Sequence, residues 1–305
     1  MSFPARLLQY TRERFPLGAY VPMILTFTFS AAAFSRMARG QTGFIPWPVF
    51  AVGCFTSLVF FFWLRVLDEH KDADTDRQFR PELPVPRGLI RLGELRAVAV
   101  TLLVIALGLN AWLNPDLLWP CLAVAAWAAL MTREFFVRAW LRAHVTWYLL
   151  SHMVIMPMID FYTTGLDWIA AGWRVPPGLE FFLVVTFLNG VVIEVGRKIR
   201  APEDEREGVD TYTQAWGLKR ATVTWQAVLL LTAFTAALAL RSIGAGPIEL
   251  ATLTAMFVLA GRTALYFRRE PTPRNAKAIE TASGLWTLGM YLLLGAGPFV
   301  VRTLG

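Results

Sequence analysis

Long apolar runs alternate with short polar connections along the whole chain. The runs cover residues 21–35, 49–64, 97–113, 117–132, 145–166, 179–196, 221–240, 247–267 and 280–301. Each approaches the roughly 20 residues that an α-helix needs to cross a bilayer. The runs are apolar on all sides, whereas a surface helix of a soluble protein carries one apolar stripe. The pattern therefore predicts an all-α integral membrane protein, a bundle of about nine transmembrane helices.

Composition supports this prediction. Of the 305 residues, 56% are hydrophobic and 17% are charged, against about 25% charged residues in a typical soluble domain. No linker or internal repeat divides the sequence, so we expect one domain over residues 1–305. The first 15 residues predict an amphipathic helix at the membrane surface. Cys54 and Cys121 lie inside apolar runs, without the spacing of metal ligands, and are expected to be packing residues.

The basic residues predict an orientation. If the N-terminus is cytoplasmic, 24 of the 29 Lys and Arg residues fall in the N-terminal segment and in the connections 65–96, 133–144, 197–220 and 262–279. Cytoplasmic loops of membrane proteins carry such an excess of positive charge. The excess therefore indicates contact with anionic lipid on the cytoplasmic side, in a prokaryotic inner membrane in the simplest case, and not binding to nucleic acid.

A first candidate site follows the second run. Asp68, Asp72 and Asp76 are spaced four residues apart, so a helix that continued beyond the membrane would place all three carboxylates on one face. Carboxylates that share a site with substrate phosphate oxygens suit Mg²⁺. A solvated acidic turn, balanced by Lys71 and Arg77, is the alternative explanation.

A second polar connection follows the sixth run. Glu194 and Lys198 are four residues apart, Pro202 interrupts the spacing, and Glu203 and Asp204 follow. Glu194 lies at the edge of an apolar run, where an ionisable residue is costly and is a functional candidate. A helix-end carboxylate that pairs with Lys198 would explain it equally well.

A third group lies within the fifth run, where His152 and Asp160 flank Pro157. The proline predicts local loosening of the helix. Either polar residue would be suited to accept a proton from an acceptor molecule or from a carbocation. Hydrogen bonds between neighbouring helices would also explain both residues, and packing explains the nearby methionines better than soft-metal binding does.

The segment from Asp68 to Asp76 resembles the first aspartate-rich motif of the UbiA superfamily of intramembrane prenyltransferases. Arg80-Pro81 and Pro86-Arg87-Gly88 are similar to the segment that precedes the third span of that family. The second polar connection occupies the place of the family's second aspartate motif, and the number of spans agrees. The chain thus looks like a member of the family whose second motif has diverged.

The resemblance implies a helix bundle around a central cavity with cytoplasmic cap loops, where Mg²⁺ holds a polyprenyl diphosphate. By position, the implied metal ligands are Asp68, Asp72, Asp76, Glu194, Glu203 and Asp204. The implied substrate-binding residues are Arg65, Arg80, Arg87, Arg138, His152, Asp160 and Lys198. Direct roles in catalysis are implied for Asp68, Asp72, Glu194 and Lys198.

The chain also departs from the family pattern. Lys198 and Pro202 stand where the second motif usually has carboxylates, and residues 131–138 replace a Tyr and Lys-Arg pattern between spans four and five. The favoured function is Mg²⁺-dependent transfer of a prenyl group to an acceptor of unspecified identity, through ionisation of the allylic diphosphate. A membrane terpene cyclase that uses the same ionisation is the first alternative. A divalent-cation or lipid-phosphate transporter is the second, although few ionisable residues lie at mid-membrane depth.

Overall fold

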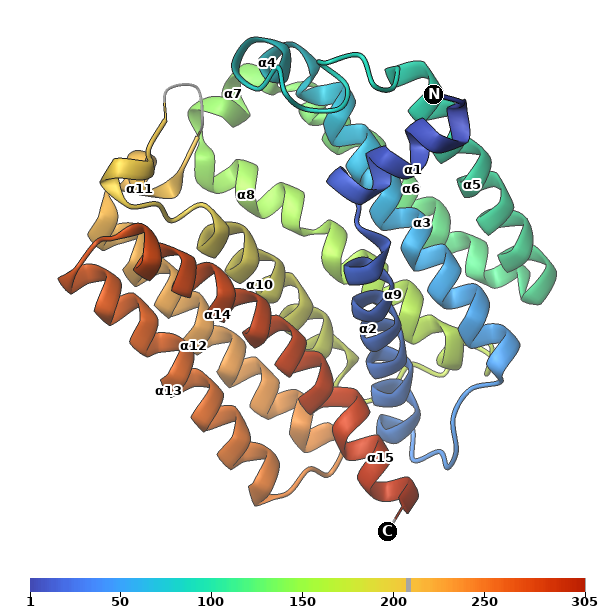
Figure 1. Cartoon of the computed structure of the whole chain (residues 1–305). Helices are drawn as coiled ribbons and strands as arrows, with labels where there is room; N and C mark the ends of the chain where they lie inside the picture. The colour runs from blue at the N-terminus through green and yellow to red at the C-terminus, as the bar shows by residue number, and fades with distance from the viewer. Residues whose placement is uncertain (207–209, 305) are drawn as a thin grey trace.

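A computed structural model describes residues 1–206 and 210–304, and these ranges contain helices and no strand (Figure 1). Within them, eight segments are long and apolar enough to cross a membrane. They are α2 (Leu17–Ala38), α3 (Trp47–Lys71), α5 (Leu92–Leu113), η1 with α6 (Pro115–Thr132), α10 (Leu179–Arg197), α12 (Leu218–Ser242), α13 (Pro247–Arg269) and α14 with its continuation (Pro273–Thr303).

A further pass through the bundle is made of two shorter helices, α8 (Val145–Met153) and α9 (Ile155–Trp168), which meet at Val154. Pro157 causes this break, because it has no N–H to donate to the carbonyl of Met153 and its ring crowds that carbonyl. In Figure 1 the two helices follow one another across the bundle. The prediction of an all-α membrane bundle with about nine passes is therefore confirmed.

The helices pack around two main apolar clusters. The larger joins α2, α10, α12, α13 and α14, and the smaller joins α3, α6 and α9. Helix α2 takes part in both, because it packs against α9 as well as α3. Figure 1 shows α12, α13 and α14 on one side of the bundle, and α3, α5 and α6 on the other.

Glycine permits a close approach between two helices near the C-terminus. Between α14 and α15 (Gly297–Leu304) the helix widens into a π turn, η4 (Leu292–Ala296). A Cβ atom on Gly295 in this turn would lie 2.1 Å from the carbonyl oxygen of Ser30 in α2. Such small-residue contacts bring helix backbones together in membranes, and this one closes α2 against the C-terminal segment.

One end of the bundle carries the short helices, and we call it the mouth. These helices are α1 (Phe3–Arg14), α4 (Ala73–Phe79), α7 (Arg138–Ala143) and α11 (Tyr212–Trp216), with the turns η2 (Glu134–Phe136) and η3 (Pro202–Asp204). They lie together at the upper end in Figure 1. The connection expected at 197–220 includes residues 207–209, which lie outside the described residues.

Candidate functional site at the mouth of the bundle

The first acidic connection bends at Asp72. Helix α3 ends at Lys71 and α4 begins at Ala73, so the helix does not continue straight through the three aspartates as the spacing suggested. Two like-charged neighbours one turn away favour this bend, and the first turn of α4 gains acidic residues that suit its N-terminus. Asp68 and Asp72 are left exposed, whereas Asp76 is 4% exposed. The prediction that one helix face presents all three is therefore wrong.

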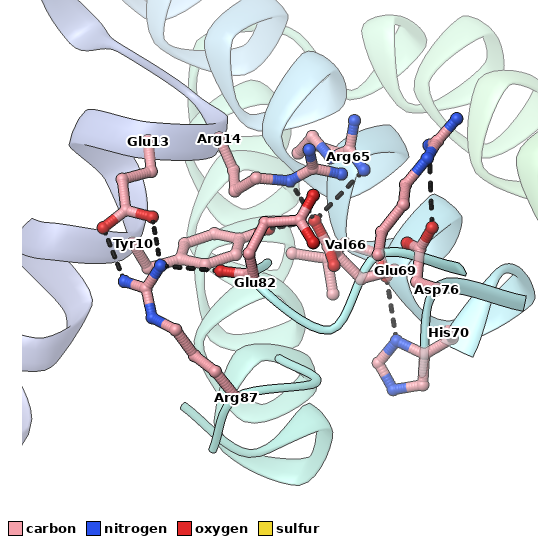
Figure 2. Close-up of polar contacts among 11 residues, drawn as sticks. Tyr10, Glu13, Arg14, Arg65, Val66, Glu69, His70, Asp76, Glu82 and Arg87 are labelled. Atoms are coloured by element: carbon pink, nitrogen blue, oxygen red, sulfur yellow. Dashed lines mark hydrogen bonds and ion pairs between the residues drawn. The ribbon is translucent and has the colours of Figure 1, made fainter. Parts of the chain in front are cut away.

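Asp76 is turned toward Arg80, whose Nη1 lies 3.6 Å from its carboxylate. Burial raises the pKa of Asp76 above its usual value, Arg80 opposes this rise, and the charge of Asp72 adds to it. Figure 2 shows Asp76 on the side of the connection that faces Glu69 and His70. Asp68 and Asp72 form no ion pair with another described residue, so they are the free carboxylates of this motif.

Helix α1 is fixed to α3 through Glu69, which is 2% exposed. Its carboxylate accepts hydrogen bonds from Arg14 Nε at 2.8 Å and from Arg65 Nη2 at 3.1 Å (Figure 2). The Tyr10 hydroxyl lies 3.5 Å from the same oxygen. We call this group the Glu69 clasp. Arg65, expected from the sequence to bind substrate, is a member of it.

Arg87 lies at the outer edge of the same region. It donates to both carboxylate oxygens of Glu13 in α1, at 2.6 and 2.9 Å, and to the Glu82 carbonyl oxygen at 2.9 Å (Figure 2). These bonds hold the pKa of Glu13 below its usual value. The structure therefore places Arg87 with α1, apart from Asp68 and Asp72.

Lys71 points from the end of α3 toward α8. Its ammonium group donates to the Tyr148 hydroxyl and lies 3.5 Å from His152 Nε2. His152 Nδ1 is 2.8 Å from the Tyr148 carbonyl oxygen, so Nδ1 carries the proton and Nε2 is the acceptor. Asp68 and Asp72 also lie within electrostatic range of the Tyr148 hydroxyl. His152 is thus brought to the mouth, although the sequence placed it within the fifth apolar run.

Glu134, to which the sequence assigned no role, faces the same lysine. It is 3% exposed, its Oε1 lies 3.7 Å from Lys71 Nζ, and its Oε2 lies 3.1 Å from Arg138 Nε. Arg138, an expected substrate-binding residue, is therefore brought to the mouth by this carboxylate. The only sequence signal for Glu134 was its place in the segment that departs from the family pattern.

Glu194 organises a second pair of cations. Its carboxylate lies 2.5 Å from Arg197 Nη2 and 2.9 Å from Lys198 Nζ. The Lys198 ammonium lies 5.8 Å from the centre of the Tyr212 ring in α11. Burial raises the pKa of the Tyr212 hydroxyl, and the charge of Glu194 adds to this rise. Glu194 is also within electrostatic range of Tyr148, so carboxylates of both acidic connections act on the same hydroxyl of α8.

The loop after α10 takes a different course. Glu203 and Asp204 lie in η3 with exposed side chains. The next residue, Glu205, accepts hydrogen bonds from the hydroxyls of Thr211 at 2.8 Å and Thr213 at 2.6 Å. Glu205 therefore closes the loop onto α11, and the structure does not bring Glu203 and Asp204 to the free aspartates through any ion pair among the described residues.

Asp160 lies inside the bundle, on α9. It is 3% exposed, accepts a hydrogen bond from the Tyr291 hydroxyl, and lies 3.4 Å from Thr163 Oγ1. It lines a cavity of about 10 Å³ with Thr28 and Ser57, close to the minimum volume for one water molecule. Asp160 is therefore separate from the charged group at the mouth.

A larger cavity, of about 420 Å³, is lateral and apolar. It lies between α6, α9 and α10 and is lined by Trp119, Pro120, Ala123, Pro157, Met158, Phe161, Trp173 and Leu183. At the mouth, Glu134 and Glu194 each form ion pairs with two cations. None of the residues expected to bind metal or diphosphate lines the lateral cavity.

The mouth as a whole combines free carboxylates with two Lys/Arg pairs. Over the described residues, no three His, Cys, Asp or Glu side chains come together as a ready-made metal cage. Asp68 and Asp72 can instead contribute one or two oxygen ligands each to a cation that a second, anionic molecule helps to bind. The four cations beside them are suited to hold that anion.

The membrane-crossing helices and this charged mouth define a multi-pass integral membrane protein. The model of the UbiA prenyltransferase family matches residues 25–298, and the chain belongs to this family. A search of curated proteins found no match.

Solved structures of similar fold cover almost the whole chain. A digeranylgeranylglyceryl phosphate synthase has a TM-score of 0.65 and 15% identity, over 96% of this chain and 99% of that one. An apo UbiA homologue from Aeropyrum pernix K1 also scores 0.65 at 15% identity, over 92% and 98%. A UbiA homologue from Archaeoglobus fulgidus, bound to DMAPP and Mg²⁺, scores 0.58 at 14% identity, over 93% and 98%. At these identities the comparison shows a shared fold alone.

Proposed function

We propose that this chain transfers a prenyl group from a prenyl diphosphate to an acceptor within the membrane. The observation that carries the proposal is the presence of two free carboxylates, Asp68 and Asp72, in the same charged region as two Lys/Arg pairs, at the mouth of a membrane-embedded bundle. Membership of the UbiA prenyltransferase family supports it, as does the DMAPP and Mg²⁺ bound by the Archaeoglobus fulgidus homologue of similar fold.

The residues at the mouth fit Mg²⁺. Asp68 and Asp72 offer hard oxygen ligands one helical turn apart, and Mg²⁺ commonly takes one or two carboxylates and completes its shell with water and phosphate oxygens. When bound, the ion supplies positive charge that neutralises the departing diphosphate. Glu194 is held by its own two cations, so Asp68 and Asp72 are the principal ligands that we propose.

Four cations are placed to bind the diphosphate: Lys71, Arg138, Arg197 and Lys198. When the allylic C–O bond breaks, its electron pair moves to the diphosphate oxygen. The cations stabilise that charge, because they are already oriented and act in a partly buried site. The rings of Tyr148 and Phe135 lie against His152 and are suited to face the allylic cation.

His152 is the proposed proton acceptor. Its Nδ1–H is fixed by the Tyr148 carbonyl oxygen, so Nε2 presents a lone pair toward Lys71 and the mouth. As the acceptor forms its bond to the prenyl carbon, it loses a proton, and Nε2 can take it. We propose that this mouth faces the cytoplasm, because the segments that form it hold most of the basic residues. A prokaryotic inner membrane is the simplest location.

The test uses the full chain in nanodiscs. Diphosphate release and lipid-soluble products are followed from geranyl, farnesyl and geranylgeranyl diphosphate, with Mg²⁺ or with chelator. Asp72→Ala should abolish release, whereas the control Asp74→Ala should not, because Asp74 is 97% exposed and paired only with Arg77. Product that needs an added acceptor supports the transferase, and a cyclised hydrocarbon formed alone would select the cyclase. No release and no saturable diphosphate binding would refute both.

A further inference from the structure

The carboxylate of Glu134 is buried but poorly satisfied. It is 3% exposed, and its Oε2 accepts no hydrogen bond of good geometry although Arg138 Nε lies 3.1 Å away. Its Oε1 is 3.7 Å from Lys71 Nζ, a longer contact than an ordinary charged hydrogen bond. A carboxylate can accept about four hydrogen bonds, so the hold of Glu134 on its two cations is loose.

The backbone that carries this carboxylate is strained. Glu134, Phe135 and Phe136 have φ values of 46°, 52° and 61°, in the left-handed region that residues other than glycine rarely adopt. Such strain persists only where surrounding contacts enforce it, and it is concentrated at functional sites. Here the ring of Phe135 packs against Trp127 at 5.2 Å and His152 at 5.9 Å. These contacts keep the turn folded, and the turn keeps Glu134 at the mouth.

Glu194 holds its two cations more tightly than Glu134 does. It holds Lys198 at 2.9 Å and Arg197 at 2.5 Å, both within hydrogen-bond distance. Its pair of cations is therefore tightly bound to an internal anion. The pair at Glu134 is not, although both carboxylates lie within electrostatic range of Tyr148. An entering anion can therefore take cations more readily from Glu134 than from Glu194.

We propose that Glu134 is an exchangeable counter-anion: it holds Lys71 and Arg138 at the mouth and competes for them with the diphosphate of the substrate and with the inorganic diphosphate released. The inference rests on the proposed function. Glu134 acts through the two cations and is a positioning residue. By repelling bound diphosphate it weakens binding and speeds product release. Removing one negative charge near the anion should tighten binding by about tenfold, the effect of repulsion between two unit charges about 12 Å apart at an effective dielectric near 20.

The experiment measures binding of inorganic pyrophosphate, with Mg²⁺, to the full chain in nanodiscs by titration calorimetry. Glu134→Gln should lower the dissociation constant about tenfold, whereas Lys71→Met and Arg138→Met should raise it. The tightening should shrink in the double variant of Glu134→Gln with Lys71→Met, because one of the contested cations is gone. Arg142→Met is the matched control, since Arg142 is exposed on the same short helix and should leave binding unchanged.

Turnover gives a second readout. The Glu134→Gln variant should have a lower kcat and should be inhibited more strongly by added pyrophosphate. A damaged fold would also lower kcat, but it would not increase this inhibition. If Glu134→Gln is not recovered as a folded protein, Glu134→Asp takes its place and should tighten binding by a smaller factor. Unchanged or weaker pyrophosphate binding in the recovered variant overturns the inference. If the wild type binds no pyrophosphate with Mg²⁺, the proposed function falls as well. If the wild type binds pyrophosphate and Lys71→Met weakens that binding, a negative result for Glu134→Gln contradicts only the inference about Glu134.

Discussion

Arg14 in α1 donates a hydrogen bond of 2.8 Å to the carboxylate of Glu69 near the end of α3. Glu69 directly follows Asp68, yet consecutive side chains on a helix point about 100° apart. One acid of the pair therefore faces the mouth, and the other fastens α1 to the bundle. Two adjacent acids in one motif thus have separate roles: Asp68 is the proposed metal ligand, and Glu69 attaches α1 to the bundle.

The Glu69 clasp should be important for stability. Glu69→Gln leaves Arg14 and Arg65 beside a neutral side chain in a site where Glu69 is 2% exposed. Breaking a buried ion pair by removing one partner costs about 3 kcal/mol, so the unfolding temperature in detergent should fall clearly. Asp74→Asn, which removes an exposed pair, should leave it unchanged. Equal unfolding temperatures for the two variants would contradict the role of the clasp.

Two glycines of the C-terminal helix segment should respond in opposite directions. Gly295→Ala places a Cβ atom 2.1 Å from the Ser30 carbonyl oxygen, which is backbone and cannot rotate away. Overpacking of this kind costs about 1–3 kcal/mol. At Gly284, a Cβ atom would meet nothing within 4 Å, so Gly284→Ala should stabilise the helix by about 0.5–1 kcal/mol. Thermal unfolding of both variants checks the prediction, and a stabilised Gly295→Ala would show that α2 and η4 are not closely packed.

The attachment of α1 should weaken in acid. Arg87 holds the pKa of Glu13 below its ordinary value of 4.5, so the unfolded chain binds the proton more readily than the folded one. The stabilisation is complete above that ordinary value and is lost as the pH falls through the lowered pKa of the folded state. The difference in unfolding temperature between wild type and Glu13→Gln should therefore be present at neutral pH and shrink in acid. A difference that grows in acid would have the wrong sign.

Metal and anion together should stabilise the fold. A ligand that binds only the folded state raises its stability according to the ratio of ligand concentration to dissociation constant. We expect Mg²⁺ with pyrophosphate to raise the unfolding temperature of the wild type, and chelator to reverse the rise. Asp68→Ala and Asp72→Ala should lose the rise, while Asp74→Ala should keep it. A rise that survives both motif variants would place the metal elsewhere.

The membrane-crossing segments could be predicted from the sequence because a bilayer demands long apolar runs. The first and last residues of these helices could not be predicted, because the helices continue into polar residues at the membrane surface. The run 97–113, for instance, belongs to a helix that begins at Leu92, where Glu94 accepts a hydrogen bond from the Arg91 amide. The pass over 145–166 was predicted as one helix, and only Pro157 signalled its break.

The spacing of charges predicted local partners better than distant ones. Glu194 and Lys198, four residues apart, do form an ion pair. Arg87 pairs with Glu13, which is 74 residues away, and no spacing rule reveals such a contact. Glu134 was not predicted, because its position depends on a left-handed turn enforced by the packing of Phe135 against two other helices.

The composition of the mouth also has a consequence for the order in which ligands arrive. The four cations that we propose to bind the diphosphate are matched by four carboxylates, those of Asp68, Asp72, Glu134 and Glu194. The charges of these eight side chains therefore balance. A diphosphate that entered alone would leave an uncompensated negative charge, and a dication alone a positive one, each costly in a partly buried site. The mouth is therefore suited to admit the two ligands as one preassembled, nearly neutral complex.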